Sequence, residues 1–149
     1  MRDDDQPPSD LPNVLVSNRQ PQPVDEPGVR ELARATLRGE GHADVELSVS
    51  FVDEAEIEDL HVRFMDEPGP TDVLSFPLDD VDEDGVRLLG DVVIAPAVAA
   101  RNNPADPAAE LRLLLVHGIL HLLGFDHEAD TEKADMWARQ ERYSGVRAP

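Results

Sequence analysis

Three of the five histidines in this chain lie within one short segment, at His117, His121 and His127. Two histidines four positions apart on a helix share one face, with Cβ atoms about 5 to 6 Å apart, so both imidazoles can reach one metal ion. Gly124 can adopt a left-handed conformation that reverses the chain and returns His127 to the same ion. Three protein ligands leave a fourth position open for water or substrate, as in catalytic zinc sites. We therefore predict a metal site at these three histidines.

The composition limits which residues can hold that metal. The chain contains no cysteine, which rules out disulfides, cysteine zinc ligands and cysteine nucleophiles. A single histidine on an apolar helix is more often a core residue than a ligand, but only His42 and His61 lie outside the cluster. We expect one zinc ion because imidazole suits zinc, while nickel, copper and iron accept the same ligands.

The histidine spacing matches the metzincin protease pattern His-Glu-x-x-His-x-x-Gly-x-x-His at every position but one. Gly118 stands where those proteases carry the glutamate that acts as general base. Asp126 and Glu128 are nearby carboxylates, but neither occupies the motif position. The pattern therefore argues against ordinary peptide hydrolysis. The glycine indicates that something large approaches the helix closely here, or that the metal acts without a carboxylate.

The charge and hydropathy of the chain exclude several classes of protein. Its 149 residues include 13 Lys+Arg and 32 Asp+Glu, giving a formal net charge of −19. Such acidity predicts weak non-specific affinity for nucleic acid. No apolar run approaches the ~18 to 20 residues of a membrane-spanning helix, and the acidic start does not resemble a secretion signal. We expect a cytoplasmic protein with no membrane contact and no DNA partner.

Helical and strand periodicities alternate along the chain around the histidine cluster. We expect strands over Asn13 to Asn18, Val45 to Val52, Val73 to Phe76 and Leu88 to Ile94. We expect helices over Pro27 to Arg38, from Asp53 to the proline pair at 68 and 70, and over Pro96 to Arg101, Pro107 to Leu123 and Thr131 to Tyr143. In the second of these helices Ile57, Leu60 and Phe64 mark the predicted buried face. The pattern predicts an α+β fold in which about five helices pack on a small mixed four-stranded sheet, with the zinc site on the central helix.

The domain organisation follows from where apolar residues occur. Residues 1–12 are rich in aspartate and proline and predict a disordered acidic tail. Residues 13–143 are long enough for one domain, and residues 144–149 predict a flexible C-terminus.

An acidic segment lies between the third and fourth predicted strands. Asp80, Asp82, Asp84 and Gly85 resemble the opening of an EF-hand calcium loop, with Asp91 at its twelfth position. That position should hold a glutamate, and the flanking segments predict strands where an EF-hand requires helices. We interpret the segment as an acidic hairpin loop.

Two weaker signals concern contacts with phosphate. The hydroxyls of Ser75 and Thr71 could bind a substrate phosphate, and capping of a turn or strand end explains them equally well. Arg30, Arg34 and Arg38 fall four residues apart and form a basic stripe on one helix face. A solvated helix face is the alternative interpretation unless a polyanion binds there.

Three motifs occur in a fixed order: Pro-Thr-Asp-Val-Leu-Ser-Phe-Pro at 70–77, Leu-Gly-Asp-Val-Val-Ile at 89–94 and His-Gly-Ile-Leu-His-Leu-Leu-Gly-Phe-Asp-His at 117–127. Together they resemble the bacterial YbeY endoribonuclease family, also called rRNA maturation factors. The resemblance extends over residues 13 to 143. It implies a zinc-dependent endoribonuclease specific for single-stranded RNA, acting in late 16S rRNA maturation and ribosome quality control.

The resemblance also carries over to individual residues. By it, His117, His121 and His127 correspond to the zinc ligands, and the expected partners are single-stranded rRNA, the small ribosomal subunit and its assembly factors. Many family members carry an arginine where this chain has Met65, and Arg63 on a helix would point to a different side. No catalytic residue is therefore assigned.

Two other functions stay open at this point. The ligand spacing also fits a metalloprotease-like hydrolase, which the missing glutamate disfavours. A non-catalytic ribosome-assembly factor that uses zinc for stability is the other alternative, and the open coordination position argues against it.

Overall fold

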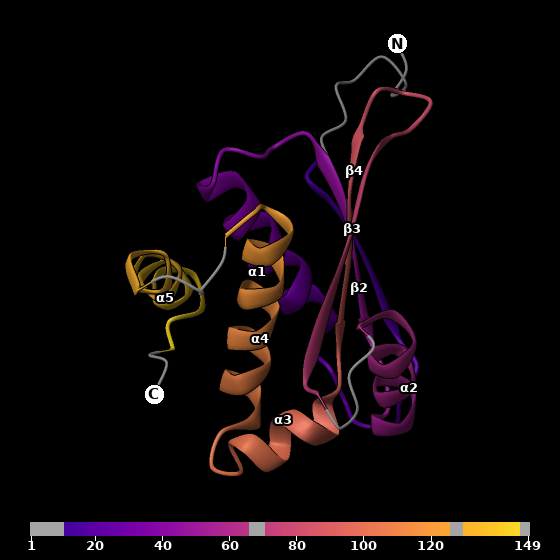
Figure 1. Cartoon of the computed structure of the whole chain (residues 1–149), viewed down its shortest axis with the longest axis vertical. Coiled ribbons are helices and arrows are strands. Elements are labelled where there is room, and N and C mark those ends of the chain that lie inside the picture. Colours follow the sequence, from indigo (N-terminus) through magenta and orange to yellow (C-terminus); the bar gives the residue numbers. More distant parts are fainter. Residues whose placement is uncertain (1–10, 66–70, 126–129, 147–149) are drawn as a thin grey trace.

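The computed structural model describes residues 11–65, 71–125 and 130–146. These residues form four strands and five helices, shown in Figure 1. The strands are β1 (Asn13–Asn18), β2 (Val45–Phe51), β3 (Val73–Val81) and β4 (Arg87–Ile94). The helices are α1 (Glu26–Gly39), α2 (Glu54–Met65), α3 (Pro96–Asn102), α4 (Pro107–Leu122) and α5 (Asp130–Ser144).

The strands form one mixed sheet in the order β1-β2-β4-β3. Strand β1 pairs parallel with β2, and β2 pairs parallel with β4. Strand β3 runs antiparallel to β4 and forms one edge of the sheet. These pairings confirm the predicted α+β fold with a mixed four-stranded sheet and five helices.

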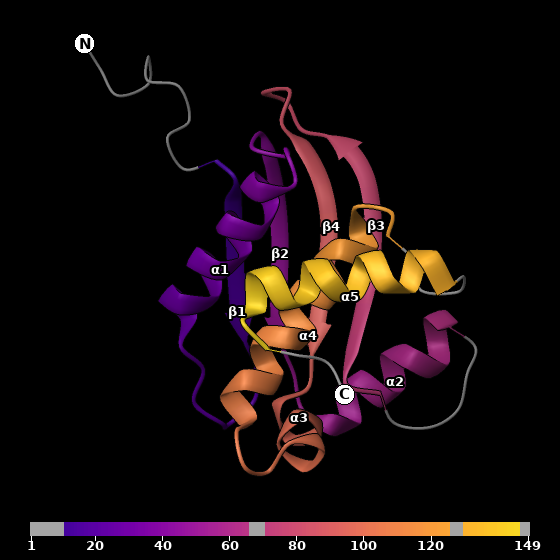
Figure 2. The same ribbon diagram turned by 90° about the vertical axis from the view of Figure 1, so that its left-hand side faces the viewer.

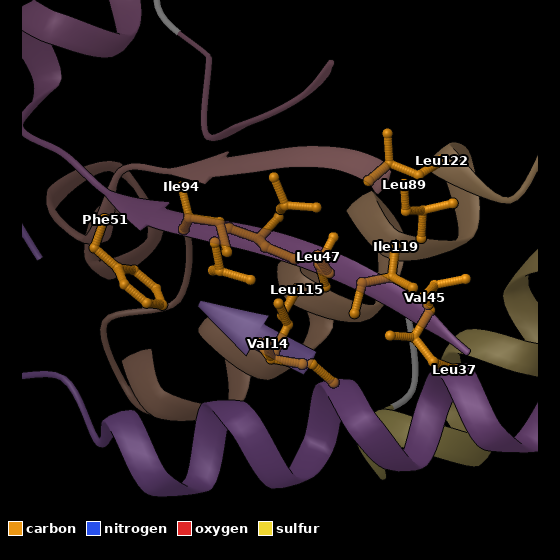
Figure 3. Packing of buried hydrophobic residues seen from close by; sticks show 14 of the residues in the cluster. Val14, Leu37, Val45, Leu47, Phe51, Leu89, Ile94, Leu115, Ile119 and Leu122 are labelled. Carbon is orange, nitrogen blue, oxygen red and sulfur yellow. The ribbon is translucent and has the colours of Figure 1, made fainter. Parts of the chain in front are cut away.

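Helices cover the two faces of the sheet unequally. Helices α1, α4 and α5 lie on one side, whereas α2 covers one end of the other side (Figures 1 and 2). Strand β2 alternates buried and half-buried residues, and its Leu47 and Phe51 pack with Leu115 and Ile119 of α4 in the main core (Figure 3). Burial of each such side chain stabilises the fold by about 1.5 to 3 kcal/mol. The core thus fixes α4 against the centre of the sheet.

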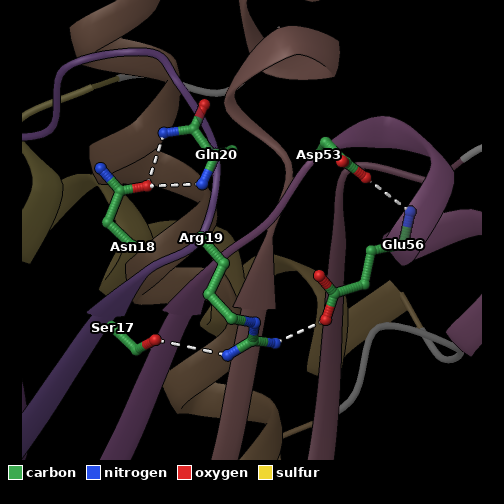
Figure 4. Close-up of polar contacts among 6 residues, drawn as sticks. All are labelled: Ser17, Asn18, Arg19, Gln20, Asp53 and Glu56. Atoms are coloured by element: carbon green, nitrogen blue, oxygen red, sulfur yellow. Dashed lines mark hydrogen bonds and ion pairs between the residues drawn. The ribbon is translucent and has the colours of Figure 1, made fainter.

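The ends of the helices follow the predicted signals. The Asp53 carboxylate accepts a hydrogen bond of 2.8 Å from the backbone N–H of Glu56, capping α2 (Figure 4). Pro107 is the first residue of α4, and Asp106 caps that helix by accepting from the backbone N–H of Ala109. Gly124, with φ of +101°, ends α4 in the left-handed region, as predicted.

Strand β3 is longer than predicted, because it continues past Pro77 to Val81. Proline lacks the N–H that a central strand needs, but it is tolerated on an edge strand. Pro77 faces Gly90 across the β3–β4 pair, and the register shifts between Pro77 and Asp80. A Cβ on Gly90 would lie 2.2 Å from the carbonyl oxygen of Phe76, so this close approach requires glycine.

The acidic segment is a β hairpin, which confirms the prediction and excludes the EF-hand alternative. The Asp82 carboxylate accepts hydrogen bonds from the backbone N–H groups of Asp84 and Val86, at 2.8 and 2.9 Å. Gly85 has a φ of +82°, which the tight turn requires. The Asp82 carboxylate therefore stabilises the turn between the two strands.

The prediction that Phe64 is buried with Ile57 and Leu60 is wrong. Ile57 is fully buried and Leu60 packs beside it, but Phe64 is 61% exposed. Helix α2 covers only one end of its sheet face, and Phe64 reaches past the core to an edge-on contact with Phe76, 5.5 Å between ring centroids.

The same helix is attached to the end of β1. Glu56 of α2 forms an ion pair of 2.5 Å with Arg19, which also donates a hydrogen bond to Ser17 (Figure 4).

The chain ends lie partly outside the described residues. Of the acidic tail predicted at 1–12, the structure describes Leu11 and Pro12, whose carbonyls accept hydrogen bonds from Arg38 and Arg34. Of the C-terminus predicted to be flexible, Ser144 is buried at the end of α5, and residues 147–149 lie outside the described ranges. No helix in the described ranges has the length and apolarity needed to cross a membrane.

Candidate metal centre

His117 and His121 lie on one face of α4, in its last two turns. Their ring centroids are 4.5 Å apart and the ring planes are inclined by 75°. Both side chains are half-buried. This geometry follows from the four-residue spacing and brings two imidazoles within reach of one ion.

The two histidines open into a pocket of about 340 Å³ between α4 and the edge strand β3. Its walls include His117, His121 and Leu122 from the helix and Val73, Ser75 and Pro77 from the strand. Because β3 is the last strand of the sheet, this wall belongs to a strand with one free edge. The site is therefore a groove along the sheet edge.

Gly118 faces the sheet and lets α4 approach it closely. A Cβ at this position would lie 2.7 Å from Cγ1 of Val92 and 3.3 Å from the Ser75 hydroxyl oxygen. Ser75 and Val92 are paired across β3 and β4, so both project from the face that α4 covers. The group predicted to approach the helix closely at Gly118 is therefore the protein's own sheet.

The Ser75 hydroxyl donates a hydrogen bond of 3.0 Å to the backbone carbonyl of Gly118. Thr71 donates to the carbonyl of Val73 at 3.4 Å. Both hydroxyls thus have partners within the protein, which favours the structural interpretation of these residues over phosphate binding.

Helix α5 reaches the site through Gln140. Its side-chain carbonyl Oε1 is hydrogen-bonded to Nδ1 of His117, although only 2% of the residue is exposed. The Trp137 ring lies edge-on to the same imidazole, 6.1 Å between centroids. Sequence reasoning missed Gln140. Its position four residues after the buried Met136 was the available signal, because it places a polar amide on the apolar face of the helix.

The residues present fit a zinc ion as far as they are described. Neutral imidazole nitrogen suits zinc, and because Nδ1 of His117 is hydrogen-bonded to Gln140, an ion at this site would be bound through Nε2. His127, Asp126 and Glu128 lie outside the described residues. Within 11–65, 71–125 and 130–146, no cluster of three or more metal-binding side chains occurs. The described part of the chain thus contains His117 and His121, two of the three residues predicted to bind the metal.

Comparison with known proteins identifies the family of this chain. The family model described as Endoribonuclease YbeY matches residues 15–145. The chain belongs to the YbeY endoribonuclease family. The Endoribonuclease YbeY of Streptomyces coelicolor is 46% identical over 141 residues, covering 86% of each chain. That of Beutenbergia cavernae is 48% identical over 137 residues, covering 85% of this chain and 91% of the relative.

The YbeY fold is also seen in a solved structure. The solution structure of TM1509 from Thermotoga maritima matches with a TM-score of 0.61 at 30% identity, over 88% of this chain and 86% of that one.

The resemblance places Met65 where many family members carry an arginine, and neither Arg63 nor Arg112 replaces that arginine at the histidine pocket. Arg63 forms an ion pair of 3.2 Å with Asp59 on α2, across the sheet from α4. Arg112 donates to the carbonyl of Ser144. Neither residue lines the histidine pocket.

Asp91 also faces away from the histidines. It pairs with Phe76 across the sheet and lies on the face covered by α2, in a hollow shared with Arg19 and Ser50. In this Gly-Asp motif, Gly90 therefore allows the close pairing of β3 with β4, and Asp91 lies on the face of the sheet opposite the histidines.

Proposed function

We propose that this chain is a zinc-dependent endoribonuclease that cleaves single-stranded RNA during maturation of 16S rRNA in the cytoplasm. Membership of a family described as endoribonuclease supports the reaction. The observation that supports metal dependence is the pair His117 and His121, whose rings share one pocket at the sheet edge.

The three histidines of the proposed site share one role. His117, His121 and His127 would hold the zinc ion. When bound, zinc supplies a Lewis acid that stabilises negative charge on phosphoryl oxygens and increases the acidity of a coordinated water. The Gln140 amide is hydrogen-bonded to His117, and the hydrogen bond from Ser75 to Gly118 joins the two walls of the pocket.

The shape of the site suits an extended strand of RNA. A pocket of about 340 Å³ is in the range of pockets that hold small ligands, which is the size class of a single nucleotide. One wall of the pocket is β3, the edge strand of the sheet, so no further strand of the described sheet lies beyond this wall.

The acidity of the chain bears on how it reaches RNA. A formal net charge of −19 repels RNA at long range. Within the described residues, the lining of the histidine pocket contains no arginine or lysine. We therefore expect weak affinity for free RNA and dependence on the small ribosomal subunit and its assembly factors as partners.

Gly118 weighs against the metalloprotease-like alternative. The position that carries the general base in metzincins is here packed against Val92, where no side chain fits. A non-catalytic assembly factor with a stabilising zinc would share the fold, and a cleavage assay separates it from an enzyme.

The assay compares three substrates: single-stranded RNA, duplex RNA and an unfolded protein, each with and without a chelator. We expect cleavage of single-stranded RNA alone, lost on chelation and in His121→Ala. His42→Ala is the matched control, since His42 lies outside the pocket beside Arg87. Cleavage of the unfolded protein would favour the protease. Intact RNA, together with a chelator that only lowers the melting temperature, would favour the assembly factor.

A further inference from the structure

Three polar side chains are buried in the described part of the chain, and one of them is unlike the others. These are Thr36, Gln140 and Ser144. The hydroxyls of Thr36 and Ser144 each donate to the backbone carbonyl four residues earlier on the same helix, at 2.8 and 2.5 Å. Gln140 instead directs its amide to a side chain on another helix, the imidazole of His117. Its burial therefore needs an explanation beyond the packing of α5.

From this contact we infer that Gln140 is a positioning residue, which holds His117 in the tautomer and orientation that bind zinc through Nε2. The inference rests on the proposed function, because it takes His117 as a metal ligand. A neutral imidazole carries its proton on one nitrogen and offers a lone pair on the other. The Gln140 carbonyl can only accept, so Nδ1 must carry the proton and Nε2 is left to coordinate.

Other side chains also contact the His117 ring and hold α5 against α4. The His117 ring meets Trp137 edge-on from α5 and His121 from its own helix. Met136, one turn before Gln140, is fully buried against Val116 and Leu120 of α4. Helix α5 is therefore anchored to α4 on apolar contacts, and Gln140 adds a directed polar contact from this helix to the metal site.

The orientation of the Gln140 amide determines which nitrogen of His117 carries the proton. With the amide turned over, its NH₂ group would donate to Nδ1, the proton would sit on Nε2, and His117 could not coordinate zinc in this pose. The two orientations thus predict opposite tautomers of the same ring, which can be distinguished by measurement.

The first experiment determines the tautomer of His117 in the zinc-free, full-length chain by ¹⁵N-labelled NMR of the imidazole at mildly alkaline pH. We expect the proton on Nδ1 in the wild-type chain and a mixture of tautomers in Gln140→Met, which keeps the side-chain length and removes the acceptor. A wild-type ring protonated on Nε2 would overturn the inference, whatever the behaviour of the variants.

The second experiment measures zinc affinity by competition with a chromophoric chelator. We expect Gln140→Met to weaken zinc binding by about 10- to 100-fold, as for other partners of metal-binding histidines. Gln140→Glu keeps an acceptor and should stay within a few-fold of wild type. Thr36→Val is the matched control, because it removes a buried polar group away from the site and should lower stability without changing zinc affinity.

The outcomes separate this inference from the proposed function. Zinc binding by Gln140→Met as tight as wild type, in a folded variant, contradicts the role of Gln140 alone. Absence of zinc binding by the wild-type chain contradicts the proposed function. If Gln140→Met does not fold, the wild-type tautomer and the affinity of Gln140→Glu still decide the inference, since a glutamate variant with zinc binding weakened 10-fold or more would contradict it.

Discussion

Ser75 on β3 and Gly118 on α4 are joined by a hydrogen bond of 3.0 Å from the serine hydroxyl to the glycine carbonyl. The bond connects the edge strand to the helix one residue after His117. Because Gly118 has no Cβ, the helix backbone comes close enough to Ser75 and Val92 for this bond to form. The spacing between the two walls of the histidine pocket is therefore set by one glycine and one serine.

We predict that Gly118→Ala destabilises the protein although alanine favours helices. The added Cβ would lie 2.7 Å from a short, stiff valine side chain, so α4 or β4 must move. Overpacking costs about 1 to 3 kcal/mol and the helix propensity of alanine returns ~1 kcal/mol, leaving a net loss of up to about 2 kcal/mol. Urea denaturation of the wild type and the variant measures this difference in the free energy of unfolding.

The control for this prediction is Val92→Ala, which makes room for the new Cβ. In that background Gly118→Ala should be neutral or stabilising, so the two changes should not be additive. Equal losses in both backgrounds would show that the contact with Val92 is not the cause.

Ser75→Ala tests whether this hydroxyl is structural. We expect a loss of about 1 kcal/mol of stability, as for a typical hydrogen bond, and a cleavage rate changed by no more than a few-fold. Denaturant unfolding and RNA cleavage are measured on the same preparations. A rate reduced by about 100-fold or more with unchanged stability would instead indicate that Ser75 binds the substrate phosphate.

Local sequence patterns were sufficient for most of the fold. The caps and stops at Asp53, Pro107 and Gly124 act within one turn of helix, so these helix ends could be predicted to within a residue or two. The length of β3 could not, because proline is tolerated at Pro77 only when the strand lies at a sheet edge. Edge position is a property of the assembled sheet.

The site was predictable only in part, for a similar reason. His117 and His121 are neighbours on one helix, so their spacing along the chain indicates their contact. Gln140 is 23 positions from His117 and meets it only because α5 packs across α4. Phe64 was misplaced because helical periodicity shows which face is apolar but not how far the sheet beneath it extends.

The ion pair between α2 and α3 predicts a pH dependence of stability. Arg101 donates two hydrogen bonds to Glu54, at 2.8 and 2.7 Å, and these hold the pKa of the Glu54 carboxyl below its ordinary value. A carboxyl whose pKa is lowered in the folded state stabilises that state above its unfolded pKa. The stabilisation is lost as the pH falls through the folded pKa.

We therefore expect Glu54→Gln to lower the melting temperature slightly at neutral pH and to have no effect in acid. Glu58→Gln is the matched control, since this exposed neighbour has no side-chain partner among the described residues and removes the same charge from an acidic chain. Thermal unfolding at a series of pH values gives the melting temperature of each variant as a function of pH. A difference in melting temperature between the two variants that persists below the pKa of Glu54 in the folded state would contradict this interpretation.

The basic stripe on α1 predicts a salt-dependent contribution to RNA binding. Arg34 and Arg38 also hold the carbonyls of Pro12 and Leu11, so Arg30 is the cleanest position to change. We expect Arg30→Glu to weaken binding of single-stranded RNA and to reduce the salt slope by about 0.7 for each RNA phosphate that the variant no longer neutralises.

Arg63→Glu is the control for the stripe. It makes the same charge change on α2, on the other side of the sheet, and likewise removes an ion pair between residues four apart. Equal effects of the two variants in a titration at several salt concentrations would mean that only net charge matters, and that the stripe is a solvated helix face.

The most direct test of the proposed metal centre is cleavage of single-stranded RNA by the chelator-treated chain before and after zinc is restored, in the wild type and in His121→Ala. We predict that zinc restores cleavage to the wild type and not to His121→Ala, because the ion needs both histidines of the α4 pair. Cleavage that persists after complete removal of metal, or that zinc restores equally in His121→Ala, would contradict the proposed metal centre.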